Sequence, residues 1–317
     1  MGQSLVAHPG IAAIAFTGSA QGGLALKAIA ESRQVPIPVF AEMGSNNPFI
    51  ITAGAITDDM EGFANGLANS VTGSGGQLCT KPGVAFVPEG EAGENLIDAF
   101  RSRLDAMEPS LLLNSSVHGR FRTGLARLSA DRVTERDELE RLAGYRQRPV
   151  AARVSVGDLA LDPSLLEELF GPFVLIVSYA DLDELESALE ALPGQLTATL
   201  RVGSNDELIC ERLAAVLQRI AGRVLFDGFP TGVAVTWAMH HGGPYPATTD
   251  PAHTSVGMTA TRRFQRPVTW QSAPQHVLPP QLRDGNPCQI SRRVNGVLTT
   301  SKLLPRSPNE DLSILNP

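Results

Sequence analysis

The chain has 317 residues, of which 43% are hydrophobic and 19% are charged, a composition typical of globular domains rather than of disordered or fibrous chains. Its formal net charge of -7 argues against a general binder of nucleic acid or of anionic membranes, and leaves small metabolites as partners. The length predicts two domains, or one large domain with a tail.

Neither a membrane protein nor a disulfide-stabilised protein is expected. No apolar run approaches the roughly 20 residues that cross a bilayer, and the start of the chain lacks the basic and apolar segments of a secretion signal. The three cysteines, Cys79, Cys210 and Cys288, are too few and too scattered for a disulfide framework or a zinc site. We therefore predict a protein of the reducing cytoplasm.

The first part of the chain predicts a strand, a turn, a helix and a second strand. The apolar run 11–16 ends at a Thr-Gly-Ser turn, residues 20–32 carry apolar side chains at helical spacing, and residues 35–42 form another apolar run. Prolines lie at the start of that second run, where a strand tolerates them.

A further helix is expected to begin at Asp58. Asp58 and Glu61 make a capping-box pattern, an apolar stripe follows, and glycines from Gly73 onward end the helix. Strands are then expected at 83–87, 173–179, 196–201 and 223–226, and helices at 95–104, 181–192 and 206–220. This alternation predicts an α/β fold with a mostly parallel sheet. Beyond Gly228 the pattern indicates long loops and extended arms.

The turn between the first strand and helix contains Gly18, Ser19 and Gly23. Free backbone N–H groups at the N-terminus of a helix favour a phosphate group. Glycine-rich turns of this kind also occur as plain tight turns, so the residues alone leave both interpretations open.

Cys79 and Glu42 are the candidates for thiol and carboxylate chemistry. Cys79 follows a glycine-rich helix end in a polar stretch, which favours a reachable thiol, whereas Cys210 and Cys288 are expected to be buried and to pack as small hydrophobic residues. Glu42 stands at a strand end, where α/β sheets place their sites, although a lone glutamate there is more often a structural cap.

Two further segments have ordinary explanations. The acidic residues before Phe170 first suggest a solvated turn with a packed phenylalanine ring. The adjacent His240 and His241 have no carboxylate or cysteine at ligand spacing along the chain, so we predict no metal site.

Four motifs in chain order carry a resemblance to a known family. They are FTGS at 16–19, FAEMGSNNP at 40–48, GQLCTKPG at 76–83 and EELFGP at 167–172. Together they resemble the aldehyde dehydrogenase superfamily. With PTGVAV at 230–235 and HGGPYPATTD at 241–250, the chain is similar to its α-ketoglutarate semialdehyde (2,5-dioxopentanoate) dehydrogenase branch.

The resemblance implies a fold and a reaction. The fold would be a mostly parallel catalytic domain with a partial Rossmann-type cofactor domain, and the reaction an oxidation of a small aldehyde with NAD or NADP. Cys79 matches the nucleophile, with its backbone N–H as an oxyanion donor, and Glu42 matches the base that activates the deacylating water. The implied cofactor-binding residues are Gly18, Ser19 and Gly23 at the pyrophosphate, and Glu168 and Phe170 at the nicotinamide ribose and ring.

The resemblance also implies a division of the chain. Residues 1–43 match the end of a nucleotide-binding domain, 44–250 a catalytic domain and 251–297 a bridging and oligomerisation arm, followed by a flexible tail at 298–317. Family members begin with a long N-terminal region that this sequence lacks, including a second oxyanion donor and a Lys for the adenosine ribose. We therefore expect a homo-oligomer, or association with a separate N-terminal half.

Two other functions stay open from the sequence. One is a catalytically impaired remnant or interaction subunit that needs a separate N-terminal half. The other is a cysteine hydrolase in which Cys79 works with one of His118, His240, His241 or His253, between which spacing does not choose. A residual esterase or thioesterase activity would need Cys79 but no hydride acceptor.

Overall fold

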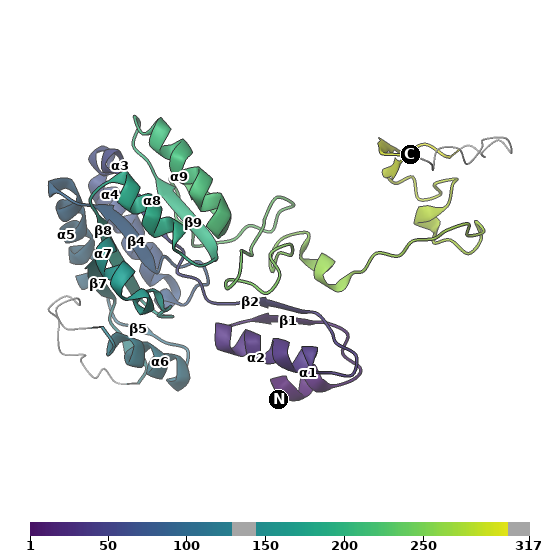
Figure 1. Cartoon of the computed structure of the whole chain (residues 1–317), viewed down its shortest axis with the longest axis horizontal. Helices are drawn as coiled ribbons and strands as arrows, with labels where there is room; N and C mark the ends of the chain where they lie inside the picture. The colour runs from purple at the N-terminus through teal and green to yellow at the C-terminus, as the bar shows by residue number, and fades with distance from the viewer. Residues whose placement is uncertain (129–143, 304–317) are drawn as a thin grey trace. The chain divides into compact units, whose positions relative to one another are not determined.

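The computed structural model describes residues 1–128 and 144–303. The chain divides into two compact units, Met1–Phe264 and Gln265–Pro317, and the first contains the main sheet and all the long helices (Figure 1). Across the described ranges, no helix is both long enough and apolar enough to cross a membrane. The domain boundaries expected at residues 43, 250 and 297 stay predictions.

A six-stranded parallel sheet forms the centre of the first unit. Its strands lie in the order β10, β9, β3, β4, β8 and β7, and all neighbouring pairs are parallel. They are β3 (Phe49–Ile51), β4 (Val84–Pro88), β7 (Val150–Ser155), β8 (Phe173–Tyr179), β9 (Gln195–Arg201) and β10 (Ala221–Phe226). The four middle strands are almost entirely buried, as expected of a parallel sheet that is covered on both faces.

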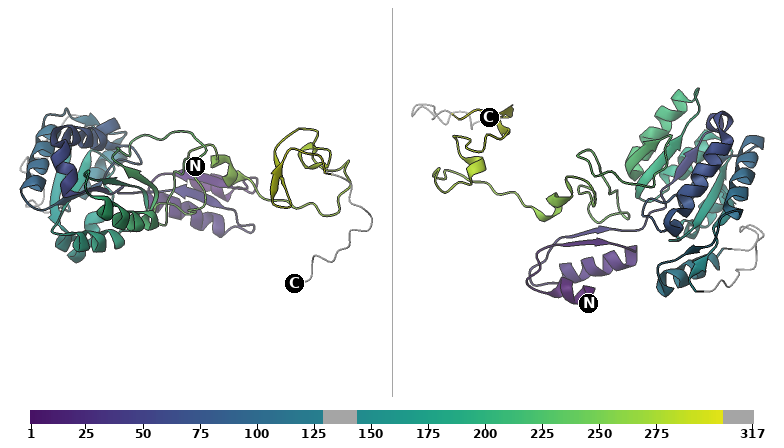
Figure 2. Two further views of the ribbon diagram at one scale, coloured as in Figure 1. Left: turned by 90° about the horizontal axis from the view of Figure 1, so that it is seen from above. Right: turned by 180° about the vertical axis from the view of Figure 1, so that it is seen from behind.

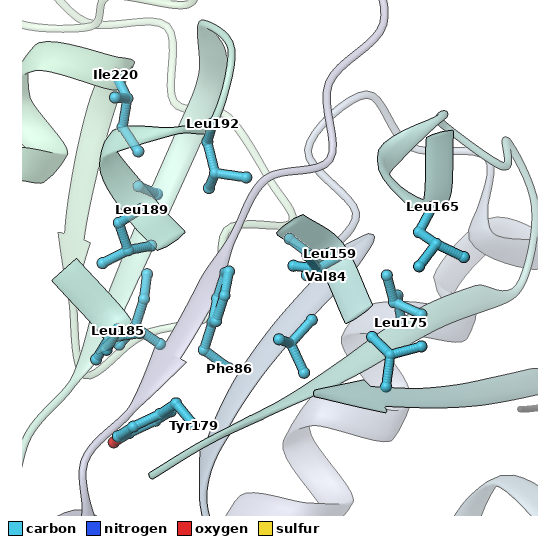
Figure 3. Close-up of a cluster of buried hydrophobic side chains, with 14 of the residues drawn as sticks. Val84, Phe86, Leu159, Leu165, Leu175, Tyr179, Leu185, Leu189, Leu192 and Ile220 are labelled. Atoms are coloured by element: carbon cyan, nitrogen blue, oxygen red, sulfur yellow. The ribbon is translucent and has the colours of Figure 1, made fainter. Parts of the chain in front are cut away.

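Helices cover both faces of this sheet (Figures 1 and 2). One face packs against α3 (Ala53–Asp58), α4 (Met60–Thr72) and α5 (Glu91–Asp105), and the other against α6 (Ser115–Leu125), α7 (Val156–Leu161), α8 (Leu182–Glu190) and α9 (Glu207–Ile220). Each face has its own hydrophobic core: the first core lies under α3, α4 and α5, and the second lies under α6, α7, α8 and α9. Side chains along a strand alternate between them, so Phe49 and Ile51 enter the first core and Ile50 enters the second. Figure 3 shows part of the second core, in which Phe86 packs with leucines of α8.

Residues 1–42 form a smaller layer of two helices and two strands. They contain α1 (Gly2–Ala7), β1 (Ile14–Thr17), α2 (Ala20–Glu31) and β2 (Val39–Glu42). The two strands are parallel, with Thr17 opposite Glu42, and they share a small core of Val6, Ile14, Ala30, Val39, Ala41 and Met43. The predicted order of strand, turn, helix and strand is confirmed. The strand β2 begins only at Val39, because Pro36 and Pro38 lack the N–H groups that a ladder needs.

The structure corrects some details of the sequence prediction. The helix α4 is capped by Asp59, whose side chain accepts a hydrogen bond from the Gly62 N–H, one residue later than the predicted cap at Asp58. The helix α6 and the edge strand β7 were not predicted. Only Phe121 and Leu125 of α6 are buried, so its sequence shows little apolar pattern.

The chain after β10 is mostly loop, as its sequence predicts. The described part contains two short 3-10 turns and one two-stranded hairpin: η3 (Ala260–Phe264), η4 (Pro280–Leu282), β11 (Arg292–Val294) and β12 (Val297–Thr299). The hairpin was not predicted, and β12 overlaps the start of the tail expected at 298–317. Residues 304–317 of that tail lie outside the described residues.

Candidate functional site

Glu42, Cys79 and His241 come together in the first unit. Glu42 ends β2, Cys79 follows the 3-10 turn η1 (Gly73–Gly76), and His241 lies in the loop after β10. The His241 Nε2 atom is 3.2 Å from the Cys79 Sγ atom and 3.4 Å from the Glu42 Oε1 atom. A nucleophilic thiol, an imidazole and a carboxylate therefore meet around one point, which we call the Glu42–Cys79–His241 cluster.

The loop that carries Cys79 packs tightly against the turn before β8. Gly76 has a φ of +66°, and a Cβ atom there would lie 2.2 Å from the Gly171 carbonyl group. Both the left-handed backbone and the close approach require glycine. The GQLCTKPG and EELFGP motifs are thus two sides of one contact.

The GSNNP segment after β2 anchors the same loop from another side. The buried Asn47 side chain donates hydrogen bonds to the carbonyl oxygens of Cys79 and Lys81, both at 2.9 Å. Its Oδ1 atom accepts from the N–H and hydroxyl groups of Thr197 on β9. Gln195 accepts hydrogen bonds from the backbone N–H groups of Asn46 and Asn47. The central sheet therefore fixes the position of the thiol through this buried polar network.

His241 is held by its backbone. Its N–H donates to the Thr254 Oγ1 atom at 2.7 Å, and its carbonyl oxygen accepts from both the N–H and the hydroxyl group of Ser255. The Ser255 hydroxyl group also donates to the Glu42 carboxylate. Glu42 in turn forms an isolated bridge with Thr248, so β2 and this loop form one wall of the site.

Burial strengthens the electrostatics of the cluster, because His241 and Glu42 are only 1% and 4% exposed. Burial acts to lower the pKa of His241, but the hydrogen bonds and charges of Cys79 and Glu42 outweigh it and raise the pKa to about 9. Burial acts to raise the pKa of Glu42, but His241, Ser255 and Arg263 outweigh it and the pKa falls. At neutral pH the cluster therefore holds an imidazolium beside an ionised carboxylate.

A second charged pair, the buried Lys81 and the half-buried Glu168, lies next to the thiol loop. Burial lowers the pKa of Lys81 to about 8 against the opposing effect of Glu168, and burial raises the pKa of Glu168 against Lys81 and a hydrogen bond from the Ser45 backbone. The Lys81 Nζ atom donates to the Phe173 carbonyl oxygen at 2.9 Å. A Cβ atom at Gly44 would lie 2.3 Å from the Glu168 Oε2 atom. Glu168 is thus packed against the GSNNP segment, which the interpretation as a solvated turn did not foresee.

The glycine turn that is expected at a cofactor lies at the carboxyl end of β2, next to Glu42. Ser19 caps α2 by accepting a hydrogen bond from the Gly22 N–H, and the Gly18 N–H donates to the Glu42 carbonyl oxygen at 3.1 Å. Gly23 is buried, and a Cβ atom there would meet the Met43 Sδ atom at 2.8 Å. An exposed helix N-terminus is suited to a phosphate group. The exposed ring of Phe170 offers an apolar surface, so these residues fit a dinucleotide.

The structure separates the cysteine and histidine candidates. Among the described residues, His241 is the histidine that contacts Cys79, a choice that spacing along the chain left open. The Nδ1 atom of His253 is 3.1 Å from an Asp250 carboxylate oxygen, while His118 lies on α6 and His240 immediately before His241. Cys210 is half-buried against the second core, as a packed cysteine would be. The expectation that Cys288 is buried is wrong: it is exposed in the second unit, where the chain forms loops rather than a core that could cover it.

Residues 1–243 match the aldehyde dehydrogenase family. The chain belongs to this family. It is 41% identical over 302 residues to alpha-ketoglutaric semialdehyde dehydrogenase 2 of Azospirillum brasilense, and 40% identical over 303 residues to alpha-ketoglutaric semialdehyde dehydrogenase of Acinetobacter baylyi. These alignments cover 93% and 94% of the chain and 57% of each relative. The chain therefore spans little more than half the length of both relatives.

Solved structures show the same fold. An indole-3-acetaldehyde dehydrogenase in complex with NAD+ matches with a TM-score of 0.69 at 19% identity, over 83% of this chain and 52% of that one. A 1-pyrroline-5-carboxylate dehydrogenase from Thermus with bound NAD matches with a TM-score of 0.67 at 22% identity, over 83% and 51%. The predicted aldehyde dehydrogenase-like α/β fold is confirmed, and the family as a whole uses NAD or NADP.

Proposed function

We propose that this protein oxidises an aldehyde to a carboxylic acid, with NAD or NADP as the hydride acceptor. The Glu42–Cys79–His241 cluster carries the proposal, because it places a thiol, a proton-transfer group and a carboxylate within 4.8 Å of one another on the family's own motifs. The chain spans 57% of its relatives, so activity of this chain by itself is part of the proposal.

Cys79 performs the attack on the aldehyde. Its sulfur bonds to the carbonyl carbon, and the carbonyl oxygen gains the negative charge that the Cys79 backbone N–H stabilises. The His241 Nε2 atom lies 3.2 Å from the sulfur, so the imidazole is placed to exchange a proton with the thiol during the attack. When bound, NAD or NADP would supply the hydride acceptor, and Cys79 would hold the substrate carbon as a thiohemiacetal that becomes a thioester when the hydride leaves.

Glu42 performs the hydrolysis of that thioester. A carboxylate whose pKa is lowered stays ionised at neutral pH and accepts a proton from water as the water attacks the acyl carbon. Ser255 and His241 hold the two carboxylate oxygens, which orients Glu42 beside the sulfur. The carboxylic acid then leaves and Cys79 is regenerated.

The substrate that we propose is a small anionic aldehyde of the α-ketoglutarate semialdehyde class. The names of the two relatives at 40% identity or more support it. The structure adds a half-buried Arg223, whose charge interacts with Cys79 and whose side chain donates to the carbonyl oxygens of Pro230 and Gly232 in the PTGVAV motif. A fixed guanidinium near the nucleophile favours a substrate that bears a carboxylate.

The test is to follow the absorbance of reduced nicotinamide while the purified chain acts on α-ketoglutarate semialdehyde with NAD or NADP. We expect turnover by the wild type and none by Cys79→Ser, while Cys288→Ser, which changes an exposed thiol, should match the wild type. A folded wild-type chain without turnover would contradict independent catalysis. Adding the N-terminal part of a relative in trans would then test whether a separate half restores it.

A second candidate function is the hydrolysis of activated esters or thioesters. The Cys79–His241 contact favours it, since an imidazole within hydrogen-bond reach of a thiol can take its proton. Glu42 approaches the same Nε2 atom, so the cysteine–histidine pair, rather than a triad ordered through Nδ1, would carry this activity. This activity needs no cofactor, so turnover of a p-nitrophenyl ester without NAD or NADP tests it. We expect the activity to be lost in Cys79→Ser and in Glu42→Gln.

A further inference from the structure

The Glu42–Cys79–His241 cluster has the composition and dimensions of a metal site. One thiolate, one imidazole and one carboxylate are the ligand types that Zn²⁺ prefers in proteins. Tetrahedral coordination with Zn–S of about 2.3 Å and Zn–N or Zn–O of about 2.0–2.1 Å places neighbouring ligand atoms about 3.4–3.6 Å apart. The separations of 3.2 Å and 3.4 Å from the His241 Nε2 atom lie close to these values, and the thiol and carboxylate, which lie within 4.8 Å, would close around the ion.

We propose that Glu42, Cys79 and His241 bind one Zn²⁺ ion, or another thiophilic divalent cation, as a reversible inhibitory site. The three ligand atoms all lie within 4.8 Å of one another, so small rotations of the side chains bring them around a single ion. Three protein ligands leave the fourth tetrahedral position for a water molecule. The ion binds a thiolate and a neutral imidazole, so binding releases the His241 Nε2 proton and any proton on the Cys79 thiol to solvent. The thiolate and the carboxylate then neutralise the two positive charges of the ion.

The surroundings hold these ligands in place before any ion arrives. The Ser255 hydroxyl group donates to the Glu42 oxygen, and the Asn47 side chain holds the carbonyl oxygen of Cys79. The contacts to Thr254 and Ser255 hold the His241 backbone, while the His241 Nδ1 atom has no hydrogen-bond partner among the described residues, so the ring can turn toward an ion. These contacts limit how far the three ligands have to move to surround one ion.

The sequence predicted no metal because it offered no ligands near His240 and His241 along the chain. The fold supplies them from β2 and from the loop after η1, so the argument from local spacing did not reach the residues that matter. The exposed Cys288 and the half-buried Cys210 are not part of the cluster.

The site has a direct consequence for the enzyme. A sulfur bound to Zn²⁺ shares its negative charge with the ion and is a much weaker nucleophile, and a bound carboxylate is a much weaker base. Zn²⁺ therefore inhibits both steps of the proposed reaction. Metal binding itself does not depend on catalysis, so it is testable even in a chain that shows no turnover.

The experiment is titration of the full, reduced chain with Co²⁺, which replaces Zn²⁺ and absorbs light according to its ligands. We expect one Co²⁺ per chain, a sulfur-to-metal charge-transfer band, and displacement of that band by one equivalent of Zn²⁺. Cys79→Ser should abolish the band. Glu42→Gln and His241→Asn should weaken binding at least about tenfold, since even outer contacts of a metal site change affinity about 10- to 100-fold.

Matched controls change the same residue types elsewhere. Cys210→Ser, Cys288→Ser and His240→Asn should bind Co²⁺ like the wild type, and thermal unfolding of each variant shows whether it is folded. If Cys79→Ser does not fold, wild-type chain alkylated at Cys79 replaces it. A charge-transfer band that survives loss of Cys79, or a folded wild type that shows no band, would overturn the proposal.

Discussion

The loop that carries Cys79 and the turn that carries Gly18 and Ser19 are supported very differently by the rest of the fold. Cys79 sits on a loop that is tied to the six-stranded sheet and its two large cores through Asn47 and Thr197. Gly18 and Ser19 sit on a two-stranded sheet with a core of only six buried residues. Since stability differs between parts of a chain according to their buried contacts, thiol chemistry should be robust and cofactor binding fragile.

The largest effect is expected from Cys79→Ser. Loss of the nucleophile should lower both aldehyde oxidation and ester hydrolysis by at least about 10⁴-fold, because both begin with attack by the sulfur. Steady-state rates of the two reactions measure it. If ester hydrolysis survived while oxidation was lost, the two activities would belong to different sites.

Glu42→Gln should have the next largest effect, and only on the second half of the reaction. The amide keeps the size of the side chain but accepts no proton, so hydrolysis of the acyl-enzyme should slow by about 10²–10⁴-fold. Rapid-mixing measurements should show a burst of reduced nicotinamide that remains near wild type. Loss of the burst as well would place Glu42 in the attack step instead.

Ser19→Ala should weaken the binding of NAD or NADP and leave the thiol chemistry unchanged. It removes the hydrogen bond to the Gly22 N–H at the start of α2, which typically costs about 1 kcal/mol, or about a fivefold change in an equilibrium. We expect a severalfold rise in the KM for NAD or NADP with ester hydrolysis unchanged. Equal losses of aldehyde oxidation and of ester hydrolysis would show that cofactor binding and thiol chemistry are not independent.

The smallest effect is expected at the surface of the central sheet. Arg153 on β7 makes hydrogen bonds to both carboxylate oxygens of Glu94 and so lowers the Glu94 pKa below 4.5. The stability that this pair contributes is present above pH 4.5 and is lost as the pH falls through the lowered pKa. Because the pair is largely exposed, Glu94→Gln should cost about 0.2–1 kcal/mol in denaturant unfolding at neutral pH and nothing at low pH. A larger loss, or one that persists in acid, would mean that Glu94 also supports packing.

The sequence revealed most of the fold and two members of the cluster. Apolar runs predicted β8 at its observed limits and located β9, β10 and the long helices, because buried strands and amphipathic helices leave a periodic pattern. The strand β3 has only three residues and was missed, as was α6 with its few buried side chains. The His241 contact depends on how the loop after β10 returns to β2, and no local pattern records that contact.

The close contacts at two glycines and the burial of Lys81 also depend on segments that are distant in the sequence. In the sequence, Gly76 belongs to the glycines that end a helix and Gly44 is only part of a motif, but the structure shows that each admits a close approach by the segment 168–171. Lys81 became notable only when its side chain proved to be buried beside Glu168. Contacts between motifs, rather than the motifs themselves, are what sequence patterns leave undetermined.

The most direct test of the central claim is the mass of the covalent intermediate. The Glu42→Gln variant, mixed with aldehyde and NAD or NADP and then quenched in acid, should carry one acyl group on the peptide that contains Cys79. The same treatment of Cys79→Ser/Glu42→Gln should leave every peptide unmodified. An acyl group on the Cys210 or Cys288 peptide, or none on the Cys79 peptide during measurable turnover, would contradict the account.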